Sequence, residues 1–299
     1  MVHVIRAEKL GFCSGANRAY EMAKKYPKAY ILGDVVHNKQ VMEWLAKRDK
    51  IVIDGVDDDT CVIPNKDTIE WLENNGKDVN QYTGKVDRPV IITAHGALKG
   101  DLERLQNLGI ELKNTTCKKV ELIYKKGIEL ENSDYQVAIY GDKNHPEVKG
   151  IASYLKNPIF INSKTLKGKN KFPEAVGIIC QSTSIRSEFE KVSSFIKNNI
   201  SRCKIVDTIC PATANRQMAA KALSKKSNLI LVIGGEHSSN TNKLKEICEY
   251  RCETHHVQTP NQLEASWFRK KEIIGITAGA STPEWIIKGI EDQINSIVA

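Results

Sequence analysis

Short apolar runs alternate along the chain with segments in which apolar residues recur at helical spacing. Such runs are typical of parallel strands that helices cover on both faces, because neither face of the strand meets water. The clearest runs fall at residues 31–32, 91–92, 137–140, 178–180, 231–233 and 275–278, and residues 1–6 also form a short strand pattern. The pattern predicts an α/β protein with parallel sheets.

Three cysteines mark an internal repeat. Cys13, Cys117 and Cys210 each follow a short apolar segment and begin a helical pattern, and two strands with polar ends come later in each unit. The period is longer than the roughly 20–50 residues of solenoid repeats, so the repeated unit is a subdomain. The predicted subdomains are 14–116, 117–206 and 207–281, with terminal segments 1–13 and 282–299 completing the core and a polar insertion at 54–88.

The residues after the strands are the ones expected to carry the chemistry. In parallel α/β sheets, functional groups gather beyond the carboxyl ends of the strands, where the helices begin. Three α/β units in a three-lobed (trefoil) ring would present one cysteine and two polar loops each to a common centre.

The chain has 299 residues, 41% hydrophobic and 27% charged, which is the composition of a folded globular protein. Its longest apolar stretch, 229–233, is far shorter than the ~20 residues of a transmembrane helix, and its first residues lack a signal-peptide apolar region. We therefore expect a cytoplasmic protein, or one of a plastid-type organelle if a targeting peptide has been removed. Because no apolar stretch is long enough, no membrane partner is expected. The net charge of +8 is dispersed, without the clustered basic residues of nucleic-acid binders, so a nucleic acid is not an expected partner either.

Three thiolates that converge from separate subdomains favour an iron–sulfur cluster over structural zinc. Structural zinc usually takes four ligands at close Cys-x2–4-Cys spacing, whereas iron–sulfur clusters accept cysteines from distant parts of a chain. Three protein ligands on a [4Fe-4S] cluster would leave one iron open as a Lewis acid. A helix start also favours the deprotonated, ligating thiolate. The alternative, three ordinary buried thiols, is disfavoured by their matched positions in the repeat.

The loops after the strands carry histidines, hydroxyls and an amide, a set suited to binding an anion. The candidates are His37, His95, His145, Ser182, Ser238, Ser239, Asn240 and Ser281. Glu147 is the carboxylate among them, and because an ionised carboxylate repels phosphate, we expect it to donate or relay a proton. The hydroxyl and amide residues can instead be helix caps, and His3 and His237 are expected to be structural or exposed.

A second group of cysteines and histidines offers a zinc hypothesis. Cys248 and Cys252 lie on a helical pattern and are followed by His255 and His256, but the pattern changes to a strand at 254–257, so convergence of all four is not expected. The cysteines without equivalents in other units are expected to be core or incidental residues: Cys61, Cys180 and Cys203. Nucleotide-binding glycine motifs, the serine-hydrolase elbow and the zincin motif are missing from the sequence.

Eight motifs follow one another along most of the chain. They are Gly11-Phe12-Cys13, Val35-Val36-His37-Asn38, Ala94-His95-Gly96, Thr116-Cys117, His145-Pro146-Glu147, Ile209-Cys210-x-Ala212-Thr213-x-Asn215-Arg216-Gln217, Ser238-Ser239-Asn240-Thr241-Asn242 and Thr277-Ala278-Gly279-Ala280-Ser281. In this order they resemble the 4-hydroxy-3-methylbut-2-enyl diphosphate reductases, the LytB-type enzymes that end the non-mevalonate isoprenoid route. Eight ordered motifs are far more specific than any single one.

The resemblance implies a three-lobed α/β fold around a central [4Fe-4S] cluster whose ligands are Cys13, Cys117 and Cys210. It implies that the substrate diphosphate is bound by His37, His95, His145, Ser238, Ser239, Asn240 and Ser281. The implied reaction is a two-electron reductive dehydroxylation of (E)-4-hydroxy-3-methylbut-2-enyl diphosphate to isopentenyl and dimethylallyl diphosphate. Glu147 would supply the proton that lets water leave, and Ser182 would hold it. Ferredoxin or flavodoxin would deliver electrons to a monomer or homodimer, and the basic surface could help such acidic donors to dock.

The chain departs from the family pattern in several places. Lys118 stands where a proline usually follows the second cysteine, Ser182 stands where a threonine is usual, the loop before His145 has fewer glycines, and the insertion at 54–88 is longer. One alternative is a divergent paralogue that reduces a different allylic or diphosphate substrate. A second alternative is a zinc phosphate-ester hydrolase that uses the histidines as ligands.

Overall fold

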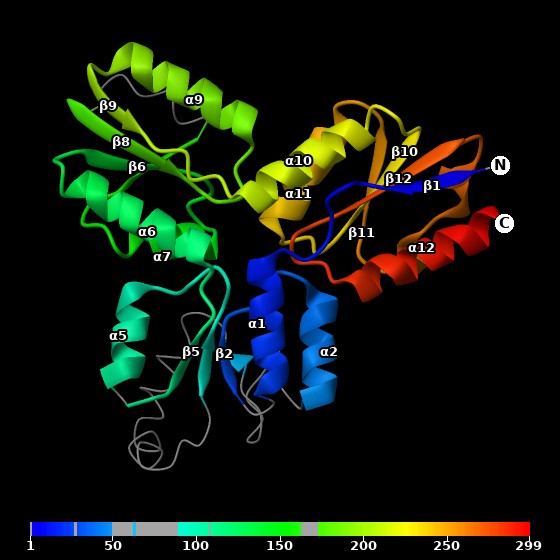
Figure 1. Cartoon of the computed structure of the whole chain (residues 1–299), viewed down its shortest axis with the longest axis horizontal. Coiled ribbons are helices and arrows are strands. Elements are labelled where there is room, and N and C mark those ends of the chain that lie inside the picture. The colour runs from blue at the N-terminus through cyan, green and yellow to red at the C-terminus, as the bar shows by residue number, and fades with distance from the viewer. Residues whose placement is uncertain (1, 27–28, 50–61, 64–88, 108, 163–172) are drawn as a thin grey trace. The chain divides into compact units, whose positions relative to one another are not determined.

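The computed structural model describes residues 2–26, 29–49, 62–63, 89–107, 109–162 and 173–299 (Figure 1). These residues form a mixed α/β fold in which all strand pairings are parallel, which confirms the predicted fold class at this level. Cys61 and the predicted insertion at 54–88 lie outside the described residues, apart from the short strand β3 (Val62–Ile63). Across the described residues, no helix has both the length and the apolar character needed to cross a bilayer.

The chain forms two compact units. The first unit comprises Met1–Asn17, Val36–Met42 and Cys210–Ala299, and the second comprises Arg18–Val35 and Glu43–Ile209. The chain passes from one unit to the other within α1 (Ser14–Lys25), after Val35, within α2 (Lys39–Asp49) and after Ile209.

The first unit is built on one four-stranded sheet in the order β1-β12-β10-β11. Its strands are β1 (His3–Arg6), β10 (Leu229–Ile233), β11 (Glu253–Val257) and β12 (Ile273–Ala278). Its helices are α10 (Pro211–Leu223), α11 (Ser239–Glu249), α12 (Glu284–Val298) and the 3-10 helices η1 (Pro260–Gln262) and η2 (Ala265–Phe268). Helices α10 and α11 lie on one side of the sheet and α12 lies on the other (Figure 1).

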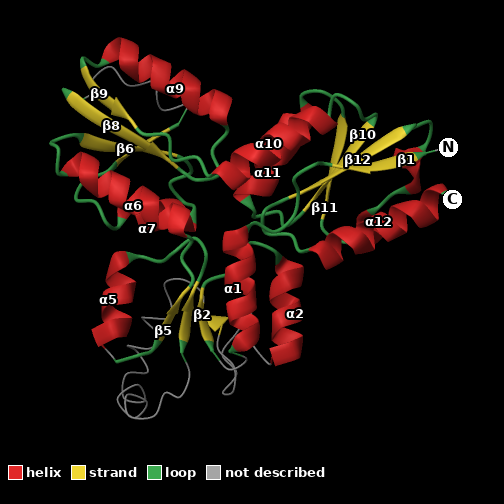
Figure 2. Cartoon of the chain, in the orientation of Figure 1, coloured by secondary structure: helices red, strands yellow, loops and turns green. Residues whose placement is uncertain are grey.

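The second unit contains two four-stranded sheets, in the orders β3-β2-β4-β5 and β7-β6-β8-β9. The remaining strands are β2 (Tyr30–Leu32), β4 (Val90–Ile92), β5 (Leu112–Asn114), β6 (Gln136–Tyr140), β7 (Ile159–Ile161), β8 (Ala175–Cys180) and β9 (Arg202–Ile205). The helices are α5 (Lys99–Asn107), α6 (Lys118–Glu131), α7 (Pro146–Ala152) and α9 (Arg186–Asn199). In the sheet that contains β8, α6 and α7 cover one face and α9 covers the other (Figure 2).

The apolar runs of the sequence form the central strands of these sheets. Every residue of β10 is fully buried, and Ile230 and Val232 pack against Leu223 of α10 and Leu244 of α11. A strand that is covered on both faces buries all its side chains, so the unbroken apolar run follows from its position. The predicted strand positions are therefore confirmed.

The helices that carry the repeated cysteines also begin where the sequence predicts. Helices α1, α6 and α10 start directly after Cys13, Cys117 and Cys210. Cys117 and Cys210 are N-cap residues with extended backbone angles, φ −64° and ψ 133° for the first and φ −66° and ψ 129° for the second. Pro211 occupies the first turn of α10, where its missing N–H has no helical partner to lose.

Candidate functional site

Glu147 and Ser182 form a buried polar pair in the second unit. Glu147 lies in the first turn of α7, and Ser182 lies just beyond the end of β8. The backbone N–H of Ser182 donates to Oε1 of Glu147, and its hydroxyl donates to Oε2, both at 2.6 Å. The two residues are only 4% and 8% exposed. Ser182 thus donates a hydrogen bond to each carboxyl oxygen of Glu147 and fixes the orientation of the carboxyl group.

His145 adjoins this pair as the N-cap of α7. Its Nδ1 accepts the backbone N–H of Glu147 at 3.1 Å. A neutral His145 therefore carries its proton on Nε2, which is a hydrogen-bond donor. The ring of His95 lies edge-on to that of His145, with 6.4 Å between the centroids. His95 and His145, two of the histidines predicted to bind an anion, thus lie next to each other.

The turn that carries His95 is held by Tyr124 of α6. The Tyr124 hydroxyl donates to the backbone carbonyl of His95 at 3.3 Å. The neighbouring Gly96 has φ +82°, and a Cβ there would lie 2.0 Å from the same hydroxyl oxygen. Burial, and to a lesser degree the charge of Glu147, raise the pKa of Tyr124, so its hydroxyl stays protonated and remains a donor.

Cys117 shares backbone contacts with the same turn. Its N–H donates to the carbonyl of Ala94, the residue before His95, at 2.9 Å. Arg18 donates from Nη2 to the carbonyl of Thr116, the residue before Cys117, at 2.5 Å. Cys117 is a half-buried free thiol. These contacts fix the cysteine and the His95 turn to each other through the main chain.

Cys13 has a matching set of contacts in the first unit. Its N–H donates to the carbonyl of Ala280, the residue before Ser281, at 3.2 Å. The N–H of Ala16, in the first turn of α1, donates to the Cys13 Sγ at 3.4 Å. An amide that points at the sulfur suits a thiolate, which accepts hydrogen bonds.

Arg216 of α10 connects the loop of Cys13 with the helix that begins after Cys210. Its Nε and Nη2 donate to the carbonyl of Gly11 at 3.0 and 2.6 Å, and Nη2 also donates to the carbonyl of Phe12 at 2.9 Å. Its Nη1 donates to a carbonyl in the first turn of its own helix. Burial lowers the pKa of this guanidinium, and the charges of the two cysteines act in the opposite direction.

The predicted serines of the first unit lie together beside the His37 loop. Ser238 is the N-cap of α11, and the Ser281 hydroxyl donates to the Ser238 Oγ at 3.2 Å and reaches the carbonyl of His37 at 3.4 Å. A Cβ on Gly235 would lie 2.3 Å from that carbonyl, so only glycine fits there. The cap role predicted as the alternative for Ser238 is thus confirmed, but its contact with Ser281 goes beyond capping.

Asn240 stands out within this group. It is 4% exposed, and neither amide atom has a hydrogen-bond partner among the described residues. A buried amide without partners is costly, so this side chain suits a site that receives a polar ligand. Ser239, between Ser238 and Asn240, is half-buried at the first position of α11.

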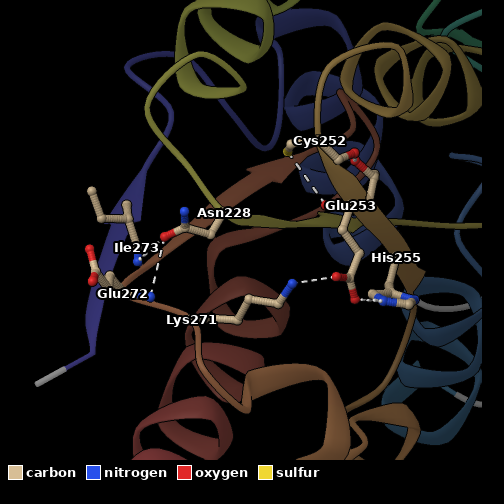
Figure 3. Close-up of polar contacts among 8 residues, drawn as sticks. Asn228, Cys252, Glu253, His255, Lys271, Glu272 and Ile273 are labelled. Atoms are coloured by element: carbon tan, nitrogen blue, oxygen red, sulfur yellow. Dashed lines mark hydrogen bonds and ion pairs between the residues drawn. The ribbon is translucent and has the colours of Figure 1, made fainter.

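The cysteines of the zinc hypothesis lie in different surroundings. Cys248 is fully buried in the core on α11, and this burial raises its pKa to about 12. Cys252 lies beyond the end of α11, and its Sγ contacts the carbonyl of Glu253 at 3.4 Å (Figure 3). The buried thiol is typical of a core cysteine.

The two histidines of that hypothesis have partners of their own. His255 contacts one oxygen of the Glu253 carboxylate at 3.0 Å, and Lys271 binds the other (Figure 3). The His255 ring also stacks on Trp267, with 3.9 Å between the centroids. His256 Nε2 contacts a backbone carbonyl at 2.8 Å. The four side chains form no common site, as expected from the change of pattern at 254–257.

The remaining histidines and cysteines differ in their exposure. His3 and His237 are exposed, and Cys180 is buried at the end of β8, as expected, while Cys203 is half-buried in β9. In the described part of the chain, no three His, Cys, Asp or Glu side chains are grouped closely enough to bind a metal ion. Cys13 and Cys210 belong to the first unit and Cys117 to the second, and their joint role as ligands stays a prediction.

Three residues of these sites received no role from the sequence. Arg216 lies within a quoted motif, and Arg18 lies on the helix after Cys13, but neither position shows which carbonyl it binds. Tyr124 was not singled out, and its only signal is a tyrosine on the buried face of a helix that begins at a repeated cysteine.

Comparisons with known proteins agree with the resemblance in the sequence. A family model described as LytB protein matches residues 4–295. The 4-hydroxy-3-methylbut-2-enyl diphosphate reductases of Campylobacter hominis and Helicobacter pylori strain Shi470 are 35% and 34% identical, and each match covers 97% of this chain and 98% of the relative.

Two solved structures are similar as well. One, described as (E)-4-hydroxy-3-methyl-but-2-enyl diphosphate reductase, the terminal enzyme of the non-mevalonate pathway, has a TM-score of 0.63 and 30% identity, covering 99% of this chain and all of that one. Another, described as E-1-hydroxy-2-methyl-but-2-enyl-4-diphosphate reductase from Plasmodium falciparum, shares the fold with a TM-score of 0.83 at 22% identity, covering 97% of this chain and 87% of that one. Because the family model matches almost the whole sequence, the chain belongs to the LytB protein family.

Proposed function

We propose that this chain is a 4-hydroxy-3-methylbut-2-enyl diphosphate reductase. The reaction adds two electrons and two protons to the allylic alcohol, breaks its C–O bond and releases water, giving isopentenyl or dimethylallyl diphosphate according to which end of the allyl group takes the proton. The observation that carries the proposal is the buried Glu147–Ser182 pair next to His145, which provides a proton source beside an anion-binding histidine.

The cysteines suit an iron–sulfur cluster by their chemistry. Cys13, Cys117 and Cys210 are half-buried cysteines at the starts of three helices. Soft thiolates are the ligands that iron–sulfur clusters take, and helix N-termini stabilise their negative charge. These three residues would hold a [4Fe-4S] cluster, with each of the three sheets as one lobe of a trefoil around it. When bound, the cluster supplies the two electrons singly and a Lewis-acidic iron.

The substrate diphosphate would be bound by two groups of donors. The first unit would supply one group, which consists of His37, Ser238, Ser239, Asn240 and Ser281. The second unit would supply the other, which consists of His95 and His145. The unpartnered amide of Asn240 and the Nε2–H that follows from the His145 tautomer support this role. A diphosphate that accepts several such bonds is held in one orientation, which places its allylic end for reaction.

The geometry of Ser182 specifies where Glu147 carries its proton. A backbone N–H can only donate, so Oε1 is always an acceptor and the proton of a neutral Glu147 resides on Oε2. The Ser182 hydroxyl contacts Oε2 and can accept that proton's hydrogen bond while donating its own to the leaving oxygen. Glu147 is therefore the catalytic acid, and Ser182 relays its proton and keeps it in place.

The electrons would come from a small acidic donor, a ferredoxin or flavodoxin. The formal charge of +8 favours an encounter with an acidic partner. The enzyme would act as a monomer or homodimer in the cytoplasm, or in a plastid-type organelle.

Iron and sulfide analysis of the anaerobically purified protein, with a visible spectrum before and after addition of the allylic diphosphate, tests the proposal. We expect a brown protein whose spectrum responds to the substrate and which forms both products with a chemical reductant. A brown protein that neither binds nor reduces this diphosphate would indicate the divergent paralogue. A protein free of iron after anaerobic reconstitution would refute the reductase and support the zinc hydrolase.

A further inference from the structure

Arg216 is a buried cation whose hydrogen bonds to the described residues all go to backbone carbonyls. It is 7% exposed, and its four bonds reach the carbonyls of Gly11, Phe12 and Ala212. None of these groups carries a charge. A buried charge is costly unless an opposite charge compensates it, so an anion held near Arg216 would stabilise this guanidinium.

Cys13 and Cys210 each lie within two residues of a carbonyl that Arg216 binds. Phe12, whose carbonyl it binds, directly precedes Cys13, and Ala212 lies two residues after Cys210. The planar guanidinium makes these bonds as a rigid fork. A single side chain therefore fastens the main chain at both cysteines and places a positive charge beside them.

The loop is shaped to receive this fork. Gly11 has φ +73°, and a Cβ there would lie 2.9 Å from Ile287 Cδ1 and 3.2 Å from the carbonyl of Thr282. The glycine lets the chain turn tightly between β1 and α1, and its carbonyl accepts two of the Arg216 bonds.

We propose that Arg216 is a positioning residue for the metal centre: it sets the approach of Cys13 to Cys210 and supplies the fixed counter-charge to the anionic cluster that they bind. This inference rests on the proposed function, because it needs the cluster. A fixed positive charge near an iron–sulfur cluster makes reduction easier, since reduction adds negative charge. Outer-shell partners of metal ligands also contribute to metal affinity.

The test compares R216Q, R216K and a matched control, R202Q, in the anaerobically reconstituted full-length protein. Arg202 is an exposed arginine in β9 that also donates to a backbone carbonyl, that of Ser133, at 3.0 Å. The readouts are iron retained during chelator challenge, the midpoint potential of the cluster by EPR-monitored titration, and thermal unfolding of the metal-free protein.

We expect R216Q to bind iron about 10–100-fold more weakly and to have a lower midpoint potential, while R202Q matches the parent. R216K keeps the charge but loses the fork, so it should hold iron more weakly at a potential closer to that of the parent.

A folded R216Q with parental iron retention and potential would overturn the inference. If R216Q does not fold, parental iron retention in R216K would overturn it instead. A parent protein that takes up no iron and sulfide refutes the proposed function itself, whereas a brown parent with an indistinguishable R216Q refutes only the role of Arg216.

Discussion

Ser182 donates its backbone N–H and its hydroxyl to the two carboxyl oxygens of Glu147, each at 2.6 Å. The backbone bond does not need the serine side chain and is kept in S182A and S182T, whereas the hydroxyl bond depends on the side chain. The contributions of the two bonds can therefore be separated by mutation.

Replacing Glu147 by Gln should keep the cluster and substrate binding while turnover falls about 10²–10⁴-fold, because an amide cannot supply the proton. Steady-state rates with a chemical reductant, together with iron content, measure this. E129Q is the matched control, since Glu129 is an exposed glutamate on α6 that forms an ion pair with Lys126 at the surface. A parental rate for E147Q would mean that another group is the acid.

Removing the Ser182 hydroxyl should slow turnover about 10–100-fold, which corresponds to the 1.5–3 kcal/mol of a hydrogen bond to a charged group. S182T restores the hydroxyl and should keep most of the rate, whereas S182A should not. The comparison of kcat and KM for both variants checks this. Equal rates for S182A and S182T would exclude the hydroxyl from proton transfer.

Gly96→Ala should destabilise the second unit by more than ~1 kcal/mol, because the residue has a positive φ and the new Cβ would lie 2.0 Å from the Tyr124 hydroxyl oxygen. Combining it with Y124F removes that oxygen and should recover part of the loss. Urea unfolding of the single and double variants measures both effects. If Y124F gave no recovery in the G96A background, the clash would not be the cause.

Gly235→Ala should weaken substrate binding, because its Cβ would lie 2.3 Å from the carbonyl of His37 and would displace a loop of the proposed diphosphate site. A raised KM with the cluster intact is the expected result. G100A is the control: a Cβ at Gly100 of α5 meets no atom within 4 Å, so alanine should leave KM unchanged and stabilise the helix by up to ~1 kcal/mol. Equal KM values for both variants would contradict the assignment of this loop.

Acid should weaken the contact of Glu253 with Lys271 and His255. Hydrogen bonds from Lys271 and then His255 lower the pKa of Glu253 from its ordinary value of 4.5, so the unfolded chain takes up the proton first. The contribution of the ionised Glu253 and its two partners to the free energy of unfolding is therefore present above pH 4.5. It is lost as the pH falls through the lower pKa that Glu253 has in the folded state. The group is largely exposed, so the effect is small. Urea unfolding of E253Q and the parent across this range should show a smaller acid-dependent loss in E253Q; parallel profiles would contradict it.

Much of the architecture is determined by local patterns. The unbroken apolar run of β10 predicts a strand covered on both faces, and the helices after Cys13, Cys117 and Cys210 begin where their spacing indicates. These features depend on periodicity and on helix-start chemistry, which neighbouring residues decide. The family resemblance also predicts that Glu147 and Ser182 act together, and the two residues are hydrogen-bonded in the structure.

Other features were decided by tertiary packing alone. Arg216 binds the carbonyl of Gly11, 205 residues earlier, and Tyr124 binds that of His95, 29 residues earlier. No local pattern shows which main-chain oxygen a buried donor will meet, because that choice depends on how helices and loops from distant segments pack. The sequence thus determines which residue types can carry out the chemistry. The fold determines which buried side chains, such as Arg216 and Tyr124, donate to the main chain around those residues and hold it in place.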